Sequence, residues 1–222
     1  MKMRLNKYIA STGQASRRKA DELISAGRVK IDGKIVTELG TKIDPDYQHV
    51  SINSQPLKQM NFIYIRLNKP EGYTCTTKTF AGEKNVLDLL DPHDKVYPVG
   101  RLDKNSCGLI FLTNDGRFAF KLTHPRFQVE KEYKVTTATK INKADLDQMK
   151  KGITDENEHL HINHFQLINP TTAQIILSQG KKREIRRLFK HFGYEINKLQ
   201  RIRIGRWPLG KLAEGQWEYF QP

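Results

Sequence analysis

VGRLDKNSCGLIFLTNDG, residues 99–116, joins a polar loop to a short apolar run. The run Leu109–Leu112 ends at Asn-Asp-Gly, a pattern that predicts a buried strand closed by a turn. The loop before it holds Asp103 two residues after Arg101, so a carboxylate and a guanidinium can lie together just outside a sheet. Asp103 is therefore a candidate catalytic residue, although most acids in such loops only cap helices or close turns.

Two other interpretations of this loop fit less well. A calcium-binding loop matches Asp103, Asn105 and Gly108, but it fails at Asn114, where the pattern requires a bidentate Glu. A glycoside hydrolase normally needs a pair of acids. The loop offers only Asp115 as a partner, and that residue lies at the far end of the predicted strand. We therefore expect neither a calcium site nor glycoside hydrolysis.

The composition favours a nucleic-acid partner. The 222 residues can form one substantial domain and a small one, and they carry a formal net charge of +14. Such an excess exceeds what solubility needs and suits a polyanion, because each phosphate that Lys or Arg neutralises releases a counterion. No run approaches the roughly 18 apolar residues of a membrane-spanning helix, and the chain begins with a polar helix. We expect a cytoplasmic protein that binds no membrane.

The sequence offers no convincing metal site. Its two cysteines, Cys75 and Cys107, form neither a disulfide framework nor a zinc-binding set. His159, His161 and His164 alternate along an expected strand with no cysteine beside them. Histidines in that arrangement are more often solvated side chains or phosphate contacts than ligands. We expect no metal.

The first quarter of the chain predicts a small helix-helix-hairpin module. A short helix over 4–10 is followed by a second helix with Ser16 as its N-cap. Residues 29–36 then alternate around Asp32-Gly33, a strong hairpin signal. Basic side chains gather at the helix ends and on the strand, where phosphate binding is favoured over a merely solvated face. These residues are Lys7, Arg17, Arg18, Lys19, Arg28 and Lys30.

The rest of the chain predicts a second, larger domain. The apolar pattern is interrupted at residues 55–61, which gives predicted domains at 1–57 and 62–222. After this boundary, apolar residues recur at the spacing of a strand in some segments and at the spacing of a helix in others. Strands are expected at 62–67, 109–112, 129–135, 162–168 and 173–177, a turn at 68–72, and helices at 85–90, after Gly116, at 142–150 and at 182–192.

The segment that begins with the last of these helices carries much of the positive charge. From Lys181 to Lys211 there are eleven Lys or Arg residues against two Glu. At about 100° per residue, Arg186 lies at the border of the apolar stripe, where its side chain can turn inward. Three other basic side chains, those of Arg183, Arg187 and Lys190, lie opposite the stripe and are expected to face RNA. Lys182, at the start of the helix, is also expected to bind RNA.

The residues from Gly100 to Gly116 resemble, without a gap, the signature of the bacterial ribosomal RNA pseudouridine synthases of the RsuA-like family. Residues 68–72, Asn-Lys-Pro, one residue and Gly, are similar to the family pattern at the same distance before the loop. Residues 4–9, 16–18 and 27–29 resemble the alpha-L RNA-binding domain, the S-four-like domain of ribosomal small-subunit proteins. The expected fold is α+β: this small domain followed by a synthase domain on a mixed, largely antiparallel sheet with flanking helices.

The resemblance implies a role for four residues. It makes Asp103 the catalytic carboxylate, acting at the sugar or at the uracil, and Tyr133 an active-site tyrosine beside the target base. Arg186 is the basic residue that pairs with Asp103 and favours its ionised form. Arg101 fills the gap that the flipped uridine leaves in the RNA stack. Glu184 stands where several relatives have Gln.

The resemblance also implies the reaction and the partner. Isomerising uridine to pseudouridine needs no cofactor, because nothing is oxidised or hydrolysed. The substrate is expected to be ribosomal RNA or a pre-ribosomal particle, with the enzyme acting as a monomer. Residues 105–109, 124–125 and 184–188 look more similar to the large-subunit RluB and RluF types. One alternative is a target uridine in the small subunit. The other is a non-catalytic ribosome-assembly factor that uses the two basic surfaces.

Overall fold

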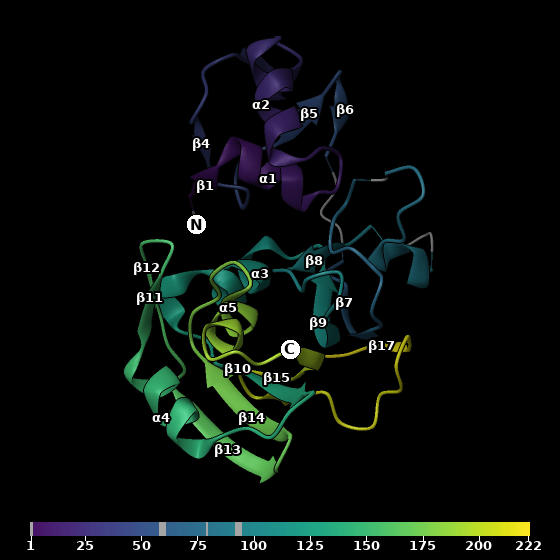
Figure 1. Cartoon of the computed structure of the whole chain (residues 1–222). Helices are drawn as coiled ribbons and strands as arrows, with labels where there is room; N and C mark the ends of the chain where they lie inside the picture. The colour runs from purple at the N-terminus through teal and green to yellow at the C-terminus, as the bar shows by residue number, and fades with distance from the viewer. Residues whose placement is uncertain (1, 58–60, 79, 92–94) are drawn as a thin grey trace. The chain divides into compact units, whose positions relative to one another are not determined.

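The computed structural model describes residues 2–57, 61–78, 80–91 and 95–222, and it divides into two compact units (Figure 1). The first unit is Met1–Phe62 with Asn114–Gly116, and the second is Ile63–Thr113 with Arg117–Pro222. Three residues of the predicted boundary, 58–60, lie outside the described part of the chain.

The first unit packs two helices on a small sheet. Helices α1 (Leu5–Ser11) and α2 (Arg17–Ser25) precede the hairpin of β2 (Val29–Ile31) and β3 (Lys34–Val36). The sheet order is β3-β2-β5-β6, with β5 at Val50–Ile52 and β6 at Gln55–Pro56. A separate pair joins β1 (Met3–Arg4) to β4 (Lys42–Ile43). The buried core consists of Leu5, Ile9, Ala20, Ile24, Val29, Ile31, Ile43 and Val50.

Local chemistry explains these elements. The Ser16 side chain accepts a hydrogen bond from the backbone N–H of Lys19 at 3.2 Å, so it caps α2 as predicted. Asp32 and Gly33 have φ values of 48° and 81°, the left-handed conformations that a two-residue hairpin requires. The predicted helix-helix-hairpin order is therefore confirmed.

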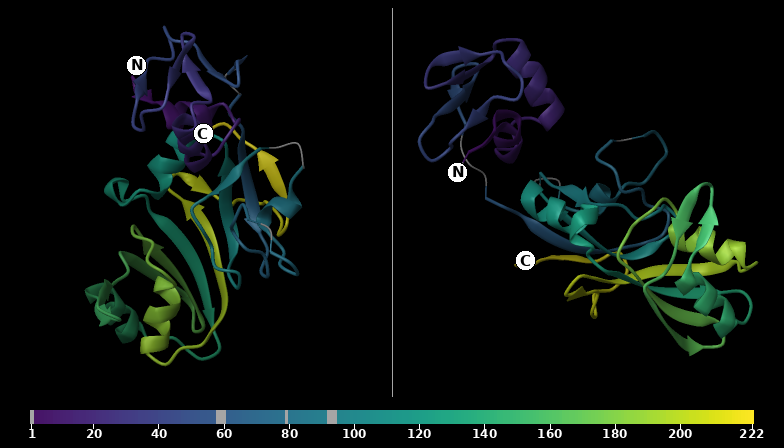
Figure 2. Two further views of the ribbon diagram at one scale, coloured as in Figure 1. Left: turned by 90° about the horizontal axis from the view of Figure 1, so that it is seen from above. Right: turned by 90° about the vertical axis from the view of Figure 1, so that its left-hand side faces the viewer.

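The second unit is built on a nine-stranded sheet of order β13-β14-β10-β15-β9-β7-β17, with β16 on β15 and β8 on β9. All the strand pairs are antiparallel except β15–β9, so the predicted mixed, largely antiparallel sheet is confirmed. The long strands β10 and β15 run side by side in each view (Figures 1 and 2). The strands are β7 (Tyr64–Lys69), β8 (Tyr97–Val99), β9 (Cys107–Thr113), β10 (Lys131–Thr137), β13 (His164–Asn169), β14 (Thr172–Leu177), β15 (Ile196–Ile204), β16 (Trp207–Pro208) and β17 (Trp217–Tyr219).

Strand β9 contains the apolar run of the opening motif and is buried along its whole length. Leu109 and Phe111 pack with Phe118 of helix α3 (Gly116–Thr123), whereas Ile110 and Leu112 pack with Val86. A strand covered on both faces has no polar alternation, which explains its continuous apolar sequence. Its loop is consequently attached to one of the most rigid parts of the sheet.

The remaining helices flank the sheet. Helix α4 (Lys143–Lys151) and helix α5 (Glu184–His191) pack their apolar side chains on β10 and β14. A 3₁₀ turn, η1 (Val86–Leu89), is capped by Asn85, and a second, η2 (Pro125–Phe127), precedes β10. A small hairpin of β11 (Ile153–Asp155) and β12 (Glu158–Leu160) follows α4.

Two sequence predictions differ from the structure. Asn68 and Lys69 were expected in a turn, but they are the buried last residues of β7. Strand β15 was not predicted, although it is central to the sheet. Its basic residues obscure the apolar alternation, and they are accommodated because several of them have polar partners in the protein.

Candidate active site

The Asp103 loop connects β8 to β9, and a buried lysine donates hydrogen bonds to its backbone. The backbone N–H of Ser106 donates to the Asp103 carbonyl oxygen at 3.0 Å, which closes the loop. Lys69 is fully buried, and its Nζ donates to the carbonyl oxygens of Ser106 at 2.6 Å and Pro70 at 2.9 Å. Burial lowers the pKa of the Lys69 ammonium, which these carbonyl oxygens solvate in place of water. The loop is therefore fixed before any substrate binds.

A cavity of about 690 Å³ opens beside this loop. It brings together the four residues predicted to act in chemistry or base flipping, which come from three separate elements. They are Arg101 and Asp103 of the loop, Tyr133 of β10 and Arg186 of α5. A volume of this size can hold one nucleotide base with part of its sugar.

Asp103 is half-buried in this cavity. Its backbone carbonyl is used in the loop, but in the described part of the chain its carboxylate has no hydrogen-bond partner and no ion pair. A carboxylate that the protein leaves unpartnered is available to a substrate atom.

Arg186 lies in the same cavity, but it does not form the predicted ion pair with Asp103. Its Nη2 donates to the carbonyl oxygen of Asn105 and, at 3.4 Å, to the Ser106 hydroxyl, and no Arg186–Asp103 ion pair forms in the described part of the chain. Burial and the neighbouring Arg183 lower the pKa of Arg186, while the charge of Asp103 raises it. The guanidinium thus acts on the carboxylate through space and binds the loop directly.

Tyr133 separates two parts of the core. Its ring packs against the cluster under α4 and α5 and against the cluster around β7 and β9. The neighbouring Lys131 also lines the cavity, while Val135 is fully buried, so this face of β10 leads from the cavity into the core. The Tyr133 hydroxyl has no hydrogen-bond partner among the described residues.

Comparison with models of known protein families shows which family has this site. The model of the RNA pseudouridylate synthase family matches residues 63–191, and that of the S4 domain matches residues 3–49. The chain belongs to the RNA pseudouridylate synthase family. Together with its relatives, these matches confirm the resemblance to the RsuA-like members and identify the chain as an isomerase.

Several relatives match this synthase over nearly its whole length. An uncharacterized RNA pseudouridine synthase of Aquifex aeolicus is 38% identical, over 98% of this chain and 90% of that protein. Ribosomal large subunit pseudouridine synthase B of Bacillus subtilis is 37% identical, over 89% and 84%. Dual-specificity RNA pseudouridine synthase RluF of Escherichia coli is 38% identical, over 97% and 74%. A crystal structure of a pseudouridylate synthase superposes with a TM-score of 0.71 at 26% identity, over 99% and 96%.

The sequence patterns missed several cavity residues of this synthase. Arg201 comes from the unpredicted strand β15, where its backbone pairs with Gly108 of β9. A Cβ at Gly108 would lie 2.3 Å from the Arg201 carbonyl oxygen, so only glycine allows these strands to approach. The alternation of arginine with isoleucine at 201–204 is the signal that could have revealed the strand. Glu184, which was expected only as a variation from Gln, also lines the cavity.

The predicted RNA-binding residues of the first unit are largely accessible in this synthase. The three cations at the start of α2 are exposed, although Lys19 pairs with Glu22 at 2.8 Å. Arg28 donates to the Asn53 side chain at 2.8 Å, and Lys7 and Lys30 are half-buried. In the second unit, the exposed members of the set are Lys182, Arg183 and Lys190.

Arg187 differs from this pattern, because it faces acids of the protein itself. Its Nε and Nη1 contact the carboxylates of Asp155 and Glu158, each at 2.5 Å, and its Nη2 donates to the Asp155 carbonyl oxygen at 2.6 Å. Only 15% of the side chain is exposed. The expectation that Arg187 faces RNA is therefore corrected: it attaches the β11–β12 hairpin to α5.

The described part of the chain contains no cluster of three or more His, Cys, Asp or Glu side chains that could hold a metal ion. Within the same residues, no helix combines the length and the apolar character needed to cross a lipid bilayer.

Proposed function

We propose that this synthase converts one specific uridine of ribosomal RNA, in the large subunit, to pseudouridine. Support for ribosomal RNA comes from the names of its relatives, one of which is a ribosomal large subunit synthase and matches 89% of the chain. The net charge of +14 and the S4-domain match suit a highly charged RNA. The proposal includes a monomeric enzyme in the cytoplasm, acting on free ribosomal RNA or on a pre-ribosomal particle.

The reaction exchanges one bond of the nucleoside for another. The bond between uracil N1 and the sugar C1′ breaks, the base rotates, and its C5 bonds to C1′. The proton leaves C5 and N1 gains one, so the product is an isomer and no cofactor is required. A base inside folded RNA must first leave its stack, and Arg101 occupies the gap.

The observation that carries this proposal is an unpartnered Asp103 carboxylate in a cavity that contains Tyr133 and Arg186. Asp103 attacks the sugar or the uracil and allows the base to detach. Arg186, which has Asp103 in its electrostatic surroundings, offsets the negative charge of the carboxylate when a bound base excludes water. Tyr133 stacks on the uracil and assists removal of the proton from C5.

The variant Asp103→Asn tests the role of the carboxylate. It keeps the shape of the side chain but removes its charge, so pseudouridine formation should be abolished while RNA affinity stays within about threefold. Turnover is measured as tritium release from ribosomal RNA labelled at uracil C5, and affinity by filter binding. Glu83→Gln is the matched control, because Glu83 pairs with Lys104 of the same loop and lies outside the cavity.

Three results would contradict the proposal. Turnover by Asp103→Asn removes the catalytic role of the carboxylate. Absence of tritium release by the unchanged enzyme favours a non-catalytic assembly factor. Mapping pseudouridines in ribosomal RNA from cells with and without the gene identifies the target, and a site in the small subunit overturns the large-subunit assignment.

A further inference from the structure

Arg201 presents an unsatisfied donor at the cavity. The residue is only 4% exposed, and its Nε donates to the carbonyl oxygen of Leu109 at 2.7 Å. Its Nη2 is buried and has no hydrogen-bond partner in the described part of the chain. A buried guanidinium nitrogen without an acceptor is costly, so such an atom beside a cavity indicates a ligand that completes its hydrogen bonds.

Lys131 is a second unpartnered cation of the same cavity. It begins β10, two residues before Tyr133, and no acceptor or acid pairs with its Nζ in the described part of the chain. Burial lowers the pKa of Lys131, and the charge of Arg201 lowers it further, while Glu184 raises it. The positive charges of Lys131 and Arg201 therefore lie close enough to repel each other unless an anion binds between them.

The acids of the cavity do not compensate these two charges. The cavity lining contains six Lys or Arg side chains and only two acidic ones, Asp103 and Glu184. Asp103 is the carboxylate assigned to the reaction. Glu184 accepts a hydrogen bond from the backbone N–H of Lys181 at 3.1 Å, and burial raises the pKa of its carboxyl. In the described part of the chain, neither acid forms an ion pair with Lys131 or Arg201.

We propose that Lys131 and Arg201 form a subsite that binds one phosphodiester of the RNA, at or next to the flipped uridine. The inference rests on the proposed function, because it assigns a place to the backbone of the same substrate. A uracil carbonyl is neutral and cannot offset two positive charges, whereas a phosphodiester carries a full negative charge and two free oxygens. Because Tyr133 and Arg201 are paired across neighbouring strands, the base and its phosphate would be fixed by one rigid piece of sheet.

The test neutralises the RNA phosphates one at a time. Short RNAs that span the mapped target each carry a single methylphosphonate, which lacks the negative charge, at a linkage at or next to the target uridine. For the unchanged enzyme, one such linkage should weaken binding about tenfold, as expected for loss of a charge-assisted contact. For Lys131→Met, the same modified linkage should cause no further loss, and the salt dependence of binding should fall by about one counterion.

Two further variants make the result specific. Lys134→Met removes an exposed cation of the same strand that lies outside the cavity, so this variant should keep the full tenfold effect of the modified linkage. Arg201→Lys retains a charge but loses the fork of the guanidinium, and it should raise KM with little change in kcat. If Arg201→Lys does not fold, the Lys131→Met series alone decides.

The outcomes distinguish the subsite from the overall function. Equal losses from the modified linkage in the unchanged enzyme and in Lys131→Met would overturn the subsite, even if both enzymes form pseudouridine. The subsite is also overturned if a methylphosphonate at none of the linkages near the target uridine weakens binding. If the unchanged enzyme does not turn over the unmodified RNA, the proposed function itself fails.

Discussion

Glu184 shows how the surroundings of one carboxyl alter its chemistry. The residue is 3% exposed, one of its oxygens has no hydrogen-bond partner among the described residues, and burial raises its pKa above the usual 4.5. Well below pH 4.5 the carboxyl is neutral in both the folded and the unfolded chain. As the pH rises past 4.5, the unfolded chain releases the proton while the folded protein must keep it or bury a charge, so stability is lost until the pH exceeds the folded-state pKa.

The variant Glu184→Gln should therefore stabilise the folded state at neutral pH. Its amide oxygen can still accept from the Lys181 N–H, and no charge is buried. We expect a gain of about 1 kcal/mol at pH 7 that disappears as the pH falls to about 4.5, measured by urea unfolding across this range. A difference that does not vary with pH would show that the titration of Glu184 contributes nothing.

Single residues of the site were predictable where a motif or a helical period marks them. The helical pattern indicated that Arg186 can turn inward, and the structure places it in the cavity. The same reasoning could not show that Arg186 binds the Asn105 carbonyl and the Ser106 hydroxyl instead of pairing with Asp103, because that choice depends on the path of a loop 81 residues away in sequence. Arg201 carries no local signal of burial, since only tertiary contacts satisfy its Nε.

At the scale of elements, α5 separates two kinds of arginine. Arg183, just before the helix, has the left-handed φ of 52°, lines the cavity and is exposed. Arg187, one turn further along, is surrounded by the acids of the β11–β12 hairpin. The helical period placed both residues away from the apolar stripe, but it could not show that a hairpin covers one of them.

We expect Arg187→Gln to destabilise the protein and Arg183→Gln to weaken RNA binding. Loss of the Arg187 network should lower the free energy of unfolding by about 1 to 2 kcal/mol, allowing for its partly exposed acids. Urea unfolding measures this change, and filter binding with the target RNA measures affinity. The assignment is wrong if Arg187→Gln leaves stability unchanged and weakens RNA binding as much as Arg183→Gln does.

The α-helices and the longer strands, with the exception of β15, followed from the sequence because each has its own local signal. The cap at Ser16 and the Asp-Gly hairpin are two such signals. Strand β15 carries only a weak local signal, the alternation of arginine with isoleucine at 201–204. Its residues form a strand because β9 and β10 lie on either side, and that neighbourhood is a property of the whole sheet.

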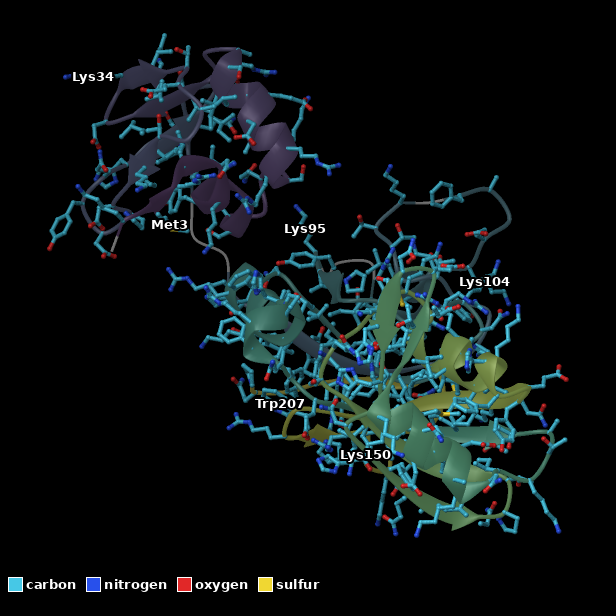
Figure 3. All side chains as sticks on the ribbon, turned by 60° about the vertical axis from the view of Figure 1, so that its left-hand side comes forward. Met3, Lys34, Lys95, Lys104, Lys150 and Trp207 are labelled. Carbon is cyan, nitrogen blue, oxygen red and sulfur yellow. The ribbon has the colours of Figure 1, made fainter. Side chains whose placement is uncertain are left out.

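At the scale of the whole molecule, charge should govern affinity more than turnover. The double variant Arg17→Ala/Arg18→Ala removes two exposed cations of α2. We expect weaker RNA binding and a salt dependence reduced by up to about two counterions, with kcat unchanged at saturating RNA. The matched control removes two cations of α4, Lys150 and Lys151, the first of which is labelled in Figure 3. If both double variants weaken RNA binding equally, affinity depends only on the total charge of the protein and not on the position of the cations.

The one parallel contact of the large sheet determines when during synthesis this enzyme can become active. Strand β9 carries the reactive loop, but its partner β15 is made some ninety residues later. Contacts so distant along the chain form slowly in folding, after local hairpins and helices. A nascent polypeptide still inside the ribosome should therefore fold its first module early and remain catalytically silent until its last quarter has emerged.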